Sequence, residues 1–131
     1  MTDTKHNALI IVPTYNERDN LPDVVKKLGE LSVDMLVVDD NSPDGTGEMA
    51  DEFAQKHTYI NVLHRKEKSG LGRAYCAGFE WALKHDYEFI FEMDGDFSHD
   101  PSDIPRFIEA ARDADLVLGT RYRGGIRVIN W

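Results

Sequence analysis

Two aspartates separated by one glycine, Asp94 and Asp96, directly follow a short apolar run in the last third of the sequence. The surrounding acids make a dense group, which consists of Glu92, Asp94, Asp96 and Asp100. Like charges this close raise one another's pKa unless a cation holds them together. Alternate residues of an extended segment point the same way, so Asp94 and Asp96 are placed to bind one hard divalent cation, Mg²⁺ or Mn²⁺. The alternative is a solvated acidic loop that caps the next helix.

A basic, glycine-rich segment, HRKEKSGLGR, ends at Arg73 and precedes a predicted helix. A glycine-rich turn at a helix N-terminus presents backbone N–H groups to a diphosphate, and the helix dipole assists. We expect Lys68, Gly70 and Arg73 to bind a diphosphate, whereas a solvated turn explains Arg65 and Lys66 equally well. The segment is no dinucleotide fingerprint, because the third glycine of G-x-G-x-x-G is absent.

A third group of charges, in the stretch TRYRGGIRV, consists of Arg121, Arg123 and Arg127 with no acid among them. Arginine binds phosphate through two parallel hydrogen bonds, so this stretch indicates a second phosphate site. Arg121 comes directly after a predicted strand and is the best placed. A solvated segment is an even alternative for Arg123 and Arg127.

Apolar patterns predict an alternation of strands and helices that would position these charges in one domain, residues 1–131. The predicted strands are residues 8–12, 34–40, 60–64, 88–93 and 115–119. Helices are predicted after the caps Asn20 and Thr46, over residues 70–85 and around residues 104–111. This alternation predicts a doubly wound α/β fold, whose mainly parallel sheet has the order 3-2-1-4-5 and helices on both faces.

The predicted order changes direction between the first and fourth strands, and ligands bind at such a point beyond the carboxyl ends of the strands. The loops PTYNE, DNSPDGT and DGDFSHD follow strands one, two and four, so all three open on that edge. We therefore expect the site there. Asp39, at the inner end of the second strand, is placed to order the loop rather than to touch a ligand.

The overall charge, the apolar runs and the single cysteine argue against several classes of protein. A pI near 4.9 argues against a nucleic-acid partner. No apolar run approaches the roughly 20 residues of a membrane span, and the first residues lack the apolar region of a signal peptide. The one cysteine, Cys76, suits a reducing cytoplasm and is expected to be a small core residue in a helix. The neighbouring aromatic residues are expected to pack in the core.

Three other functional classes share parts of this pattern. An aspartyl-nucleophile phosphatase places its acid pair after the first strand of its core, whereas three strand–helix units precede DGDFS here. A phosphoacceptor receiver domain requires a lysine after its fifth strand, where this sequence has GTRYRGG. A non-catalytic nucleotide-binding module stays open.

Five motifs in order, IVPTYNERDNLP, VVDDNSPDGT, SGLGRAYCAGF, EMDGDFSHDP and GTRYRGG, resemble those of polyprenol-phosphate (dolichol-phosphate) mannose synthases. These are inverting family-2 glycosyltransferases of the GT-A fold, and the resemblance covers almost the whole chain. It implies nucleoside contacts by Pro13, Tyr15, Glu17 and Asp40. It further implies metal binding by Asp94 and Asp96, and an acceptor phosphate on Arg121. Gly95 departs mildly from the alanine usual between the two acids.

The resemblance implies transfer of a sugar, mannose from GDP-mannose, to a polyprenyl monophosphate with inversion. A lipid phosphate has a second pKa of about 6 and needs no dedicated base to attack. UDP-glucose or another donor, and a non-catalytic fragment, are the alternatives.

Family members continue well beyond the GGIRVINW-like segment. We therefore expect an incomplete GT-A domain, the nucleotide-sugar-binding part of a longer enzyme, that is poorly active in transfer. Apolar surface left beside the fourth or fifth strand would favour self-association. The complete enzyme is expected at the cytoplasmic face of the membrane, as a peripheral protein.

Overall fold

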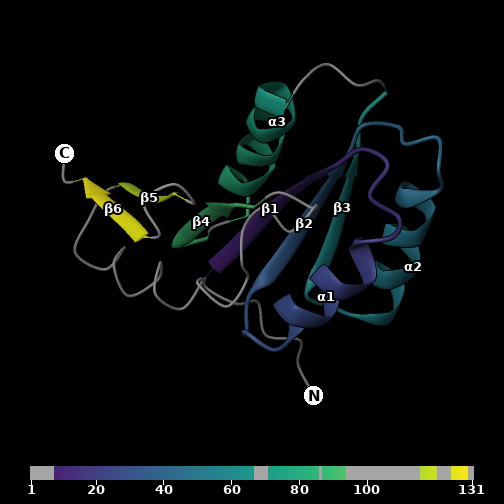
Figure 1. Cartoon of the computed structure of the whole chain (residues 1–131), viewed down its shortest axis with the longest axis horizontal. Helices are drawn as coiled ribbons and strands as arrows, with labels where there is room; N and C mark the ends of the chain where they lie inside the picture. Colours follow the sequence, from purple (N-terminus) through teal and green to yellow (C-terminus); the bar gives the residue numbers. More distant parts are fainter. Residues whose placement is uncertain (1–7, 67–70, 86, 94–115, 121–124, 130–131) are drawn as a thin grey trace.

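The computed structural model describes residues 8–66, 71–85, 87–93, 116–120 and 125–129. Strands and helices alternate along the first of these segments, as the sequence predicts (Figure 1). The elements are β1 (Ala8–Thr14), α1 (Leu21–Gly29), β2 (Asp34–Asp39), α2 (Thr46–Lys56), β3 (Ile60–His64), α3 (Leu71–Leu83) and β4 (Phe89–Glu92). The predicted fourth helix, around residues 104–111, lies outside the described residues.

The first four strands form one parallel sheet in the order β3-β2-β1-β4. β1 lies at its centre, where Ile11 pairs with Leu36 of β2 and with Glu92 of β4. The prediction for these four strands is confirmed, including the change of direction between β1 and β4. The carboxyl ends of β1 and β4 therefore flank the expected ligand position.

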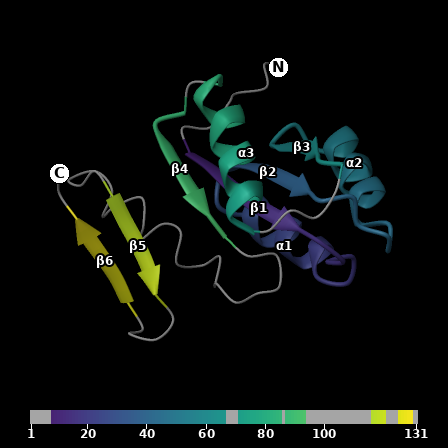
Figure 2. The same ribbon diagram turned by 90° about the horizontal axis from the view of Figure 1, so that it is seen from above.

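The predicted fifth strand is present, but its predicted place beside the fourth strand was wrong. β5 (Leu116–Thr120) pairs with β6 (Gly125–Ile129) in a separate antiparallel sheet and not with β4 (Figures 1 and 2). Thr120 pairs with Gly125, so the connection between the two strands is short. A short connection permits antiparallel pairing, whereas parallel neighbours need a crossover of a dozen or more residues. The apolar pattern did not reveal β6, so the predicted partner of β5 was wrong.

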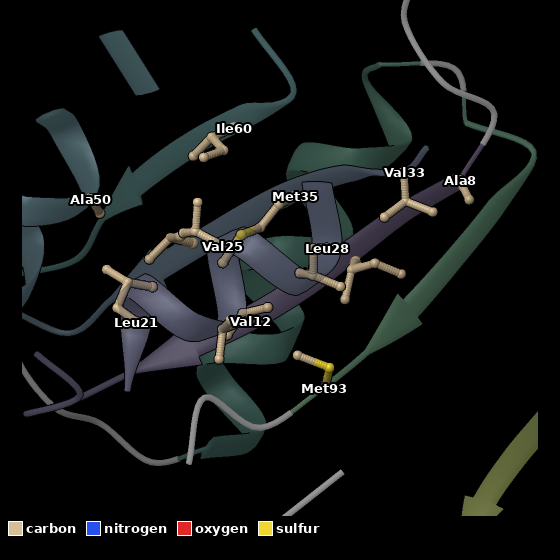
Figure 3. Close-up of a cluster of buried hydrophobic side chains, with 13 residues drawn as sticks. Ala8, Val12, Leu21, Val25, Leu28, Val33, Met35, Ala50, Ile60 and Met93 are labelled. Carbon is tan, nitrogen blue, oxygen red and sulfur yellow. The ribbon is translucent and has the colours of Figure 1, made fainter. Parts of the chain in front are cut away.

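Both faces of the sheet are covered, which explains why β1 and β2 are buried along their whole length and are apolar apart from the end residues Thr14, Asp34 and Asp39. Alternate residues of each strand point to opposite faces. Ile10 and Val12 face α1 and α2, while Leu9 and Ile11 face α3. Figure 3 shows the first of these layers, in which Leu21, Val25 and Leu28 of α1 pack around Val12 and Met35. Figures 1 and 2 show the helices on the two sides of the sheet.

α3 packs closely on β1, and Gly78 makes this possible. A Cβ atom at Gly78 would lie 2.6 Å from Cγ2 of Ile11, so any larger residue would push the helix away from the sheet. Tyr75, Phe79 and Trp81 pack on this layer, as expected. Cys76 is exposed, so its assignment to the core was wrong. Its neighbours Ala74 and Gly78 are buried, which shows that Cys76 lies on the outer side of α3.

Local boundaries differ from the predictions in three places. β1 continues through the buried Pro13 to Thr14 rather than ending at Val12. Asn20 makes no side-chain cap for α1, since its own backbone is helical (φ −93°, ψ −26°). Its Nδ2 donates to Oε2 of Glu17 (3.0 Å). Thr46 is the first residue of α2 and not its cap. Among the described residues, no helix has the length and apolar composition needed to cross a membrane.

Candidate functional site

The loops that follow β1 and β2 are joined into one unit at the carboxyl edge of the sheet. The backbone N–H of Asn16 donates to Oγ of Ser42 at 3.0 Å. The backbone N–H of Glu17 donates to Oγ1 of Thr46 at 3.1 Å. Side chains of the second loop thus satisfy the backbone of the first, and the two loops hold a fixed relative position.

Asp39 lies at the centre of this unit and is 1% exposed. Its carboxylate accepts three hydrogen bonds: from Oγ1 of Thr14 (2.7 Å), from Oγ of Ser42 (2.7 Å) and from the backbone N–H of Ser42 (3.0 Å). Because these donors come from the end of β1 and from the loop after β2, Asp39 joins the starting points of both loops. The expectation that it orders the loop is confirmed.

Gly47, in the first turn of α2, allows the helix to approach this carboxylate. A Cβ atom there would lie 2.9 Å from Oδ2 of Asp39 and 3.2 Å from Cε1 of His64. His64 itself pairs with Asp51, with Nε2 and Oδ1 at 2.8 Å, and both side chains are about half exposed. The chain therefore needs glycine at position 47 to bring α2 close to the ends of β2 and β3.

Arg18 and Asp44 join the outer parts of the same two loops. The backbone N–H of Arg18 donates to Oδ2 of Asp44 (3.3 Å), and its Nη1 donates to the Asp44 carbonyl oxygen (3.1 Å). Asp44 also accepts hydrogen bonds from the backbone N–H and the hydroxyl of Thr46. Burial by itself would raise the pKa of Asp44. The hydrogen bonds from Thr46 and Arg18 outweigh that effect, and the pKa of Asp44 is lowered.

Each loop contains an asparagine in the left-handed backbone region. Asn16 has φ 56° and Asn41 has φ 55°. Asparagine tolerates this region better than other residues with a side chain, yet such positions persist only where the surrounding structure enforces them. The hydrogen bonds to Ser42 and Asp39 supply that enforcement, so the loop conformations are set before any ligand binds.

An ion pair between Asp40 and Arg65 joins the end of β3 to the end of β2. The Asp40 carboxylate is buried, and its Oδ1 accepts a hydrogen bond from Nη1 of Arg65 at 3.1 Å. The backbone N–H of Arg65 donates to the carbonyl oxygen of Asp39 at 2.8 Å, continuing the pairing of β2 with β3. The guanidinium therefore neutralises a carboxylate that would otherwise be costly to bury.

The residues expected to contact a nucleoside gather at this edge. Pro13 is buried in β1, whereas Tyr15 is 36% exposed just beyond the strand end. Glu17 is half-buried and accepts a hydrogen bond from Asn20. Asp40 is tied to the end of β1, because its backbone N–H donates to the Thr14 carbonyl oxygen at 3.1 Å. The structure thus places all of these residues on two adjacent loops and strand ends.

The expected phosphate and metal residues are only partly described. Arg73 is exposed in the first turn of α3, and Arg127 lies in β6. The remaining predicted residues lie outside the described residues: Lys68, Gly70, Asp94, Asp96, Arg121 and Arg123. Within the described part of the chain, no group of three or more histidine, cysteine, aspartate or glutamate residues could hold a metal ion.

The path of β4 nevertheless bears on the acid pair. The backbone N–H of Met93, the residue after the strand, donates to the Ile11 carbonyl oxygen at 2.9 Å. Asp94 is the next residue in the sequence. The chain therefore leaves β4 beside β1, at the carboxyl edge where the two loops lie.

Sequence reasoning missed the residues that join the loops, chiefly Ser42, Thr46 and Arg65. Their types carried no distinctive signal, because serine and threonine are ordinary in turns and loops. The contact of Arg65 with Asp40 could have been predicted from the strand register. In a parallel pair that aligns Asp39 with His64, the next residue of each strand end is also adjacent.

Comparison with known proteins places the chain in a family. Residues 9–131 match the family described as Glycosyl transferase family 2. The chain is 50% identical over 126 residues to an undecaprenyl-phosphate mannosyltransferase of Micrococcus luteus, covering 95% of this chain and 52% of the relative. It is 49% identical over 128 residues to a polyprenol monophosphomannose synthase of Mycolicibacterium smegmatis, covering 95% of this chain and 48% of the relative. The chain thus spans about half the length of these curated relatives.

More distant similarity includes an archaeal relative and a solved structure. A dolichol-phosphate mannosyltransferase of Pyrococcus furiosus is 38% identical over 127 residues, covering 93% of this chain and 35% of the relative. The solved structure is a mannosyltransferase of Pyrobaculum calidifontis in complex with GDP-mannose and Mn²⁺. It superposes with a TM-score of 0.57 at 26% identity, covering 71% of this chain and 28% of the other. The parallel sheet, the loops at its carboxyl edge and the match over residues 9–131 lead to one conclusion: the chain belongs to glycosyl transferase family 2.

Proposed function

We propose that this chain binds GDP-mannose and takes part in transferring mannose to a polyprenyl monophosphate. The observation that carries the proposal is the identity of about half of its residues, over 95% of the chain, with two bacterial proteins whose names state polyprenyl-phosphate mannose chemistry. The solved relative with GDP-mannose and Mn²⁺ supports the same donor. The receiver, phosphatase and non-catalytic alternatives have no comparable support.

The nucleoside of the donor would lie over the carboxyl ends of β1 and β2. In the proposal, Tyr15 supplies an exposed ring, Asp40 a carboxylate for base N–H groups, and Pro13 and Glu17 complete the contact. The preset backbone of the two loops favours binding, because little conformational entropy remains to be lost when the ligand arrives. Lys68, Gly70 and Arg73 would meet the diphosphate at the start of α3.

Asp94 and Asp96 would hold a divalent cation, Mg²⁺ or Mn²⁺. Their fit rests on chemistry and on place: two carboxylates are the ligands such cations prefer, and they follow β4 where it leaves the sheet beside β1. A bound cation would neutralise charge on the leaving diphosphate. The chain's own part is to hold the two carboxylates and to orient the donor.

The acceptor would be a lipid monophosphate whose oxygen attacks the anomeric carbon opposite the leaving diphosphate, so that configuration inverts. This phosphate is already ionised at neutral pH, since its second pKa is about 6, and no side chain has to remove a proton. Arg121, Arg123 and Arg127 would bind and orient it, because guanidinium groups match phosphate geometry. Positioning the two substrates is then the main contribution of the protein.

We further propose that these residues form the nucleotide-sugar-binding part, and that full transfer rates need the additional length found in the relatives. The acceptor is a membrane lipid, so the complete protein would act as a peripheral protein at the cytoplasmic face.

The test combines a donor panel with a transfer assay. GDP-mannose, UDP-glucose and GDP are compared by thermal shift with and without Mn²⁺, because a ligand that binds only the folded state raises its stability. We expect GDP-mannose with Mn²⁺ to give the largest shift. In the assay with a short polyprenyl phosphate, the Micrococcus luteus relative is the positive control, and we expect slower formation of the mannosyl lipid by this chain. Preference for UDP-glucose, or a covalent phosphate adduct seen by intact mass, would overturn the proposal.

A further inference from the structure

We infer that Arg65 is a positioning residue for base recognition, which fixes the Asp40 carboxylate so that it selects a guanine base. The inference rests on the proposed function, in which Asp40 contacts the nucleoside. Neither the predicted phosphate site nor the predicted nucleoside contacts include Arg65. Its assignment comes from the contact between the two side chains in the structure.

The geometry holds the Asp40 carboxylate from one side. Nη1 of Arg65 donates to Oδ1 of Asp40 at 3.1 Å, and the two side chains are 20% and 6% exposed. Oδ2 of Asp40 accepts no hydrogen bond from any residue that the structure describes. One oxygen is thus held by the guanidinium, and the other is available to a ligand.

Both residues are also fixed through their backbones. The Asp40 N–H donates to the Thr14 carbonyl oxygen at 3.1 Å, and the Arg65 N–H donates to the Asp39 carbonyl oxygen at 2.8 Å. Both side chains therefore start from backbone positions that are held directly at the ends of β2 and β3. Such support is what keeps a recognition group within a fraction of an ångström of its working geometry.

A carboxylate held in this way discriminates between bases by their N–H groups. Guanine presents two adjacent donors, N1–H and the N2 amino group, on its Watson–Crick edge. Adenine presents an acceptor, N1, at the corresponding place, and a lone pair facing a buried carboxylate is unfavourable. Discrimination of this kind depends on a fixed carboxylate. A carboxylate that can rotate away from adenine avoids the unfavourable contact, so the difference in binding free energy between the two bases becomes smaller.

A second role for Arg65 makes a different prediction. If Arg65 touched the diphosphate directly, its removal would weaken GDP and ADP equally and independently of Asp40. If Arg65 acts through Asp40, its removal weakens mainly GDP, and it has no further effect once Asp40 is altered. A double-mutant cycle separates these two cases.

The experiment measures dissociation constants for GDP and ADP by calorimetry in the presence of Mn²⁺. The variants are Arg65→Met, Asp40→Asn and the double variant, with Lys66→Met as the matched loss of one exposed positive charge at the next position. Arg65→Lys tests rescue, since lysine keeps the charge and one donor. Thermal unfolding is recorded for each variant, because leaving Asp40 buried without its partner also destabilises the fold.

We expect Arg65→Met to weaken GDP by about tenfold, the size of one charged hydrogen bond, and to change ADP by less than about twofold. The double variant should match Asp40→Asn, Arg65→Lys should recover part of the loss, and Lys66→Met should keep the wild-type ratio of GDP to ADP affinity. Equal losses for both nucleotides, or additive losses in the cycle, would overturn the inference. If Arg65→Met fails to fold, the comparison of Arg65→Lys with wild type decides by the same ratio. Wild-type protein that binds neither nucleotide would instead count against the proposed function.

Discussion

Buried carboxylates occur at both ends of β2, and they serve different purposes. At the amino end, Oδ2 of Asp34 accepts a hydrogen bond from the Tyr87 hydroxyl at 2.6 Å, which ties β2 to the segment before β4. At the carboxyl end, Asp39 and Asp40 are bound by groups from β1, from the loop after β2 and from the end of β3. The first contact joins two pieces of scaffold, whereas the second set organises a surface.

The contrast teaches where function should be sought in this fold. A buried carboxylate that accepts a hydrogen bond from a scaffold phenol contributes to stability. A carboxylate at the open edge, fixed by its neighbours and with one oxygen available, is prepared for binding. Changes at the carboxyl edge should therefore reduce nucleotide affinity, and changes at the amino edge should reduce stability alone.

The largest expected effect is on metal-dependent binding at the carboxyl edge. We predict that Asp94→Ala combined with Asp96→Ala weakens GDP-mannose binding in Mn²⁺ by about 100-fold or more, since loss of outer partners alone costs roughly 10–100-fold. The unfolding temperature should be unchanged or higher, because repulsion between like charges is removed. Calorimetry measures the affinity, and Glu88→Gln is the control. Unchanged Mn²⁺-dependent affinity would show that the acid pair is not the metal site.

The second largest effect is expected at Asp39, whose substitution should cost more stability than substitution of an exposed carboxylate. We predict that Asp39→Asn lowers the free energy of unfolding by about 1–3 kcal/mol, because an amide cannot accept from Thr14 and from both Ser42 donors at once. The loops should also lose their fixed position, so GDP affinity should fall as well. Urea unfolding and calorimetry measure the two quantities.

Asp51→Asn is the matched control, since that carboxylate is half exposed and pairs only with His64 among the interactions described. Its effect on unfolding should stay within about 0.5 kcal/mol. If Asp39→Asn were equally mild in both measurements, Asp39 would not organise the loops.

At the amino edge, Tyr87→Phe should affect stability without affecting binding. We predict a loss of about 1–3 kcal/mol in the free energy of unfolding, because Asp34 loses a donor while it stays buried. Tyr59→Phe removes a hydrogen bond to a neutral acceptor, the Val25 carbonyl oxygen, and should cost about 0.5–1.5 kcal/mol. GDP affinity should be that of the wild type in both variants. A fall in affinity in Tyr87→Phe would end the distinction between the two edges.

The pH dependence of the Tyr87 contact has a definite sign. Burial, the hydrogen bond to Asp34 and the charge of Asp34 raise the pKa of Tyr87 above its ordinary value of 10.0. Its contribution to stability is therefore full below about pH 10 and is lost as pH rises toward the higher folded-state pKa. The difference in unfolding free energy between wild type and Tyr87→Phe should be constant from about pH 7 to 9 and shrink above pH 10.

The smallest effect concerns Asp44, whose contacts are near the surface. Its pKa is lowered despite the opposing effect of burial, because Thr46 and Arg18 donate hydrogen bonds to the carboxylate. Its contribution is thus present above the ordinary value of 3.8 and lost as pH falls through the lower folded-state value. We predict that Asp44→Ala unfolds slightly more easily than wild type at pH 7, and that the two converge as pH falls through the lowered folded-state pKa of Asp44. A difference that persisted in acid would point to packing rather than charge.

The sequence predicted the parallel sheet because its central strands carry an unambiguous signal. A run such as ALIIV has no polar face and must be covered on both sides, which favours a doubly wound fold. Element ends were less predictable. Asn20 and Thr46 are good caps by type, yet Asn20 has helical backbone angles, and Thr46 is the first residue of α2 and donates its hydroxyl to Asp44. β5 was misplaced because strand pairing depends on a partner, β6, that the apolar pattern did not reveal.

The candidate site likewise contains residues that could be predicted from the sequence and residues that could not. Asp39 was predicted to order the loop from its place at the end of the second strand, whereas Asp40 was assigned to the nucleoside by the family resemblance alone. The roles of Ser42 and Arg65 required the register of three strands and the shape of two loops, neither of which a residue type encodes. The exposed position of Cys76 similarly depends on which side of α3 packs against β1.

The most direct test of the difference between the two edges is an amide NMR titration of the chain with GDP-mannose and Mg²⁺. Binding should shift the signals of Tyr15, Asn16, Asp40 and Asn41 at the carboxyl edge. The signals of Asp34 and Tyr87 at the amino edge should stay in place, and repetition with Mn²⁺ should broaden only the first group. Shifts centred on Asp34 and Tyr87, or an unchanged spectrum at saturating GDP-mannose, would contradict the assignment of the nucleotide-sugar site.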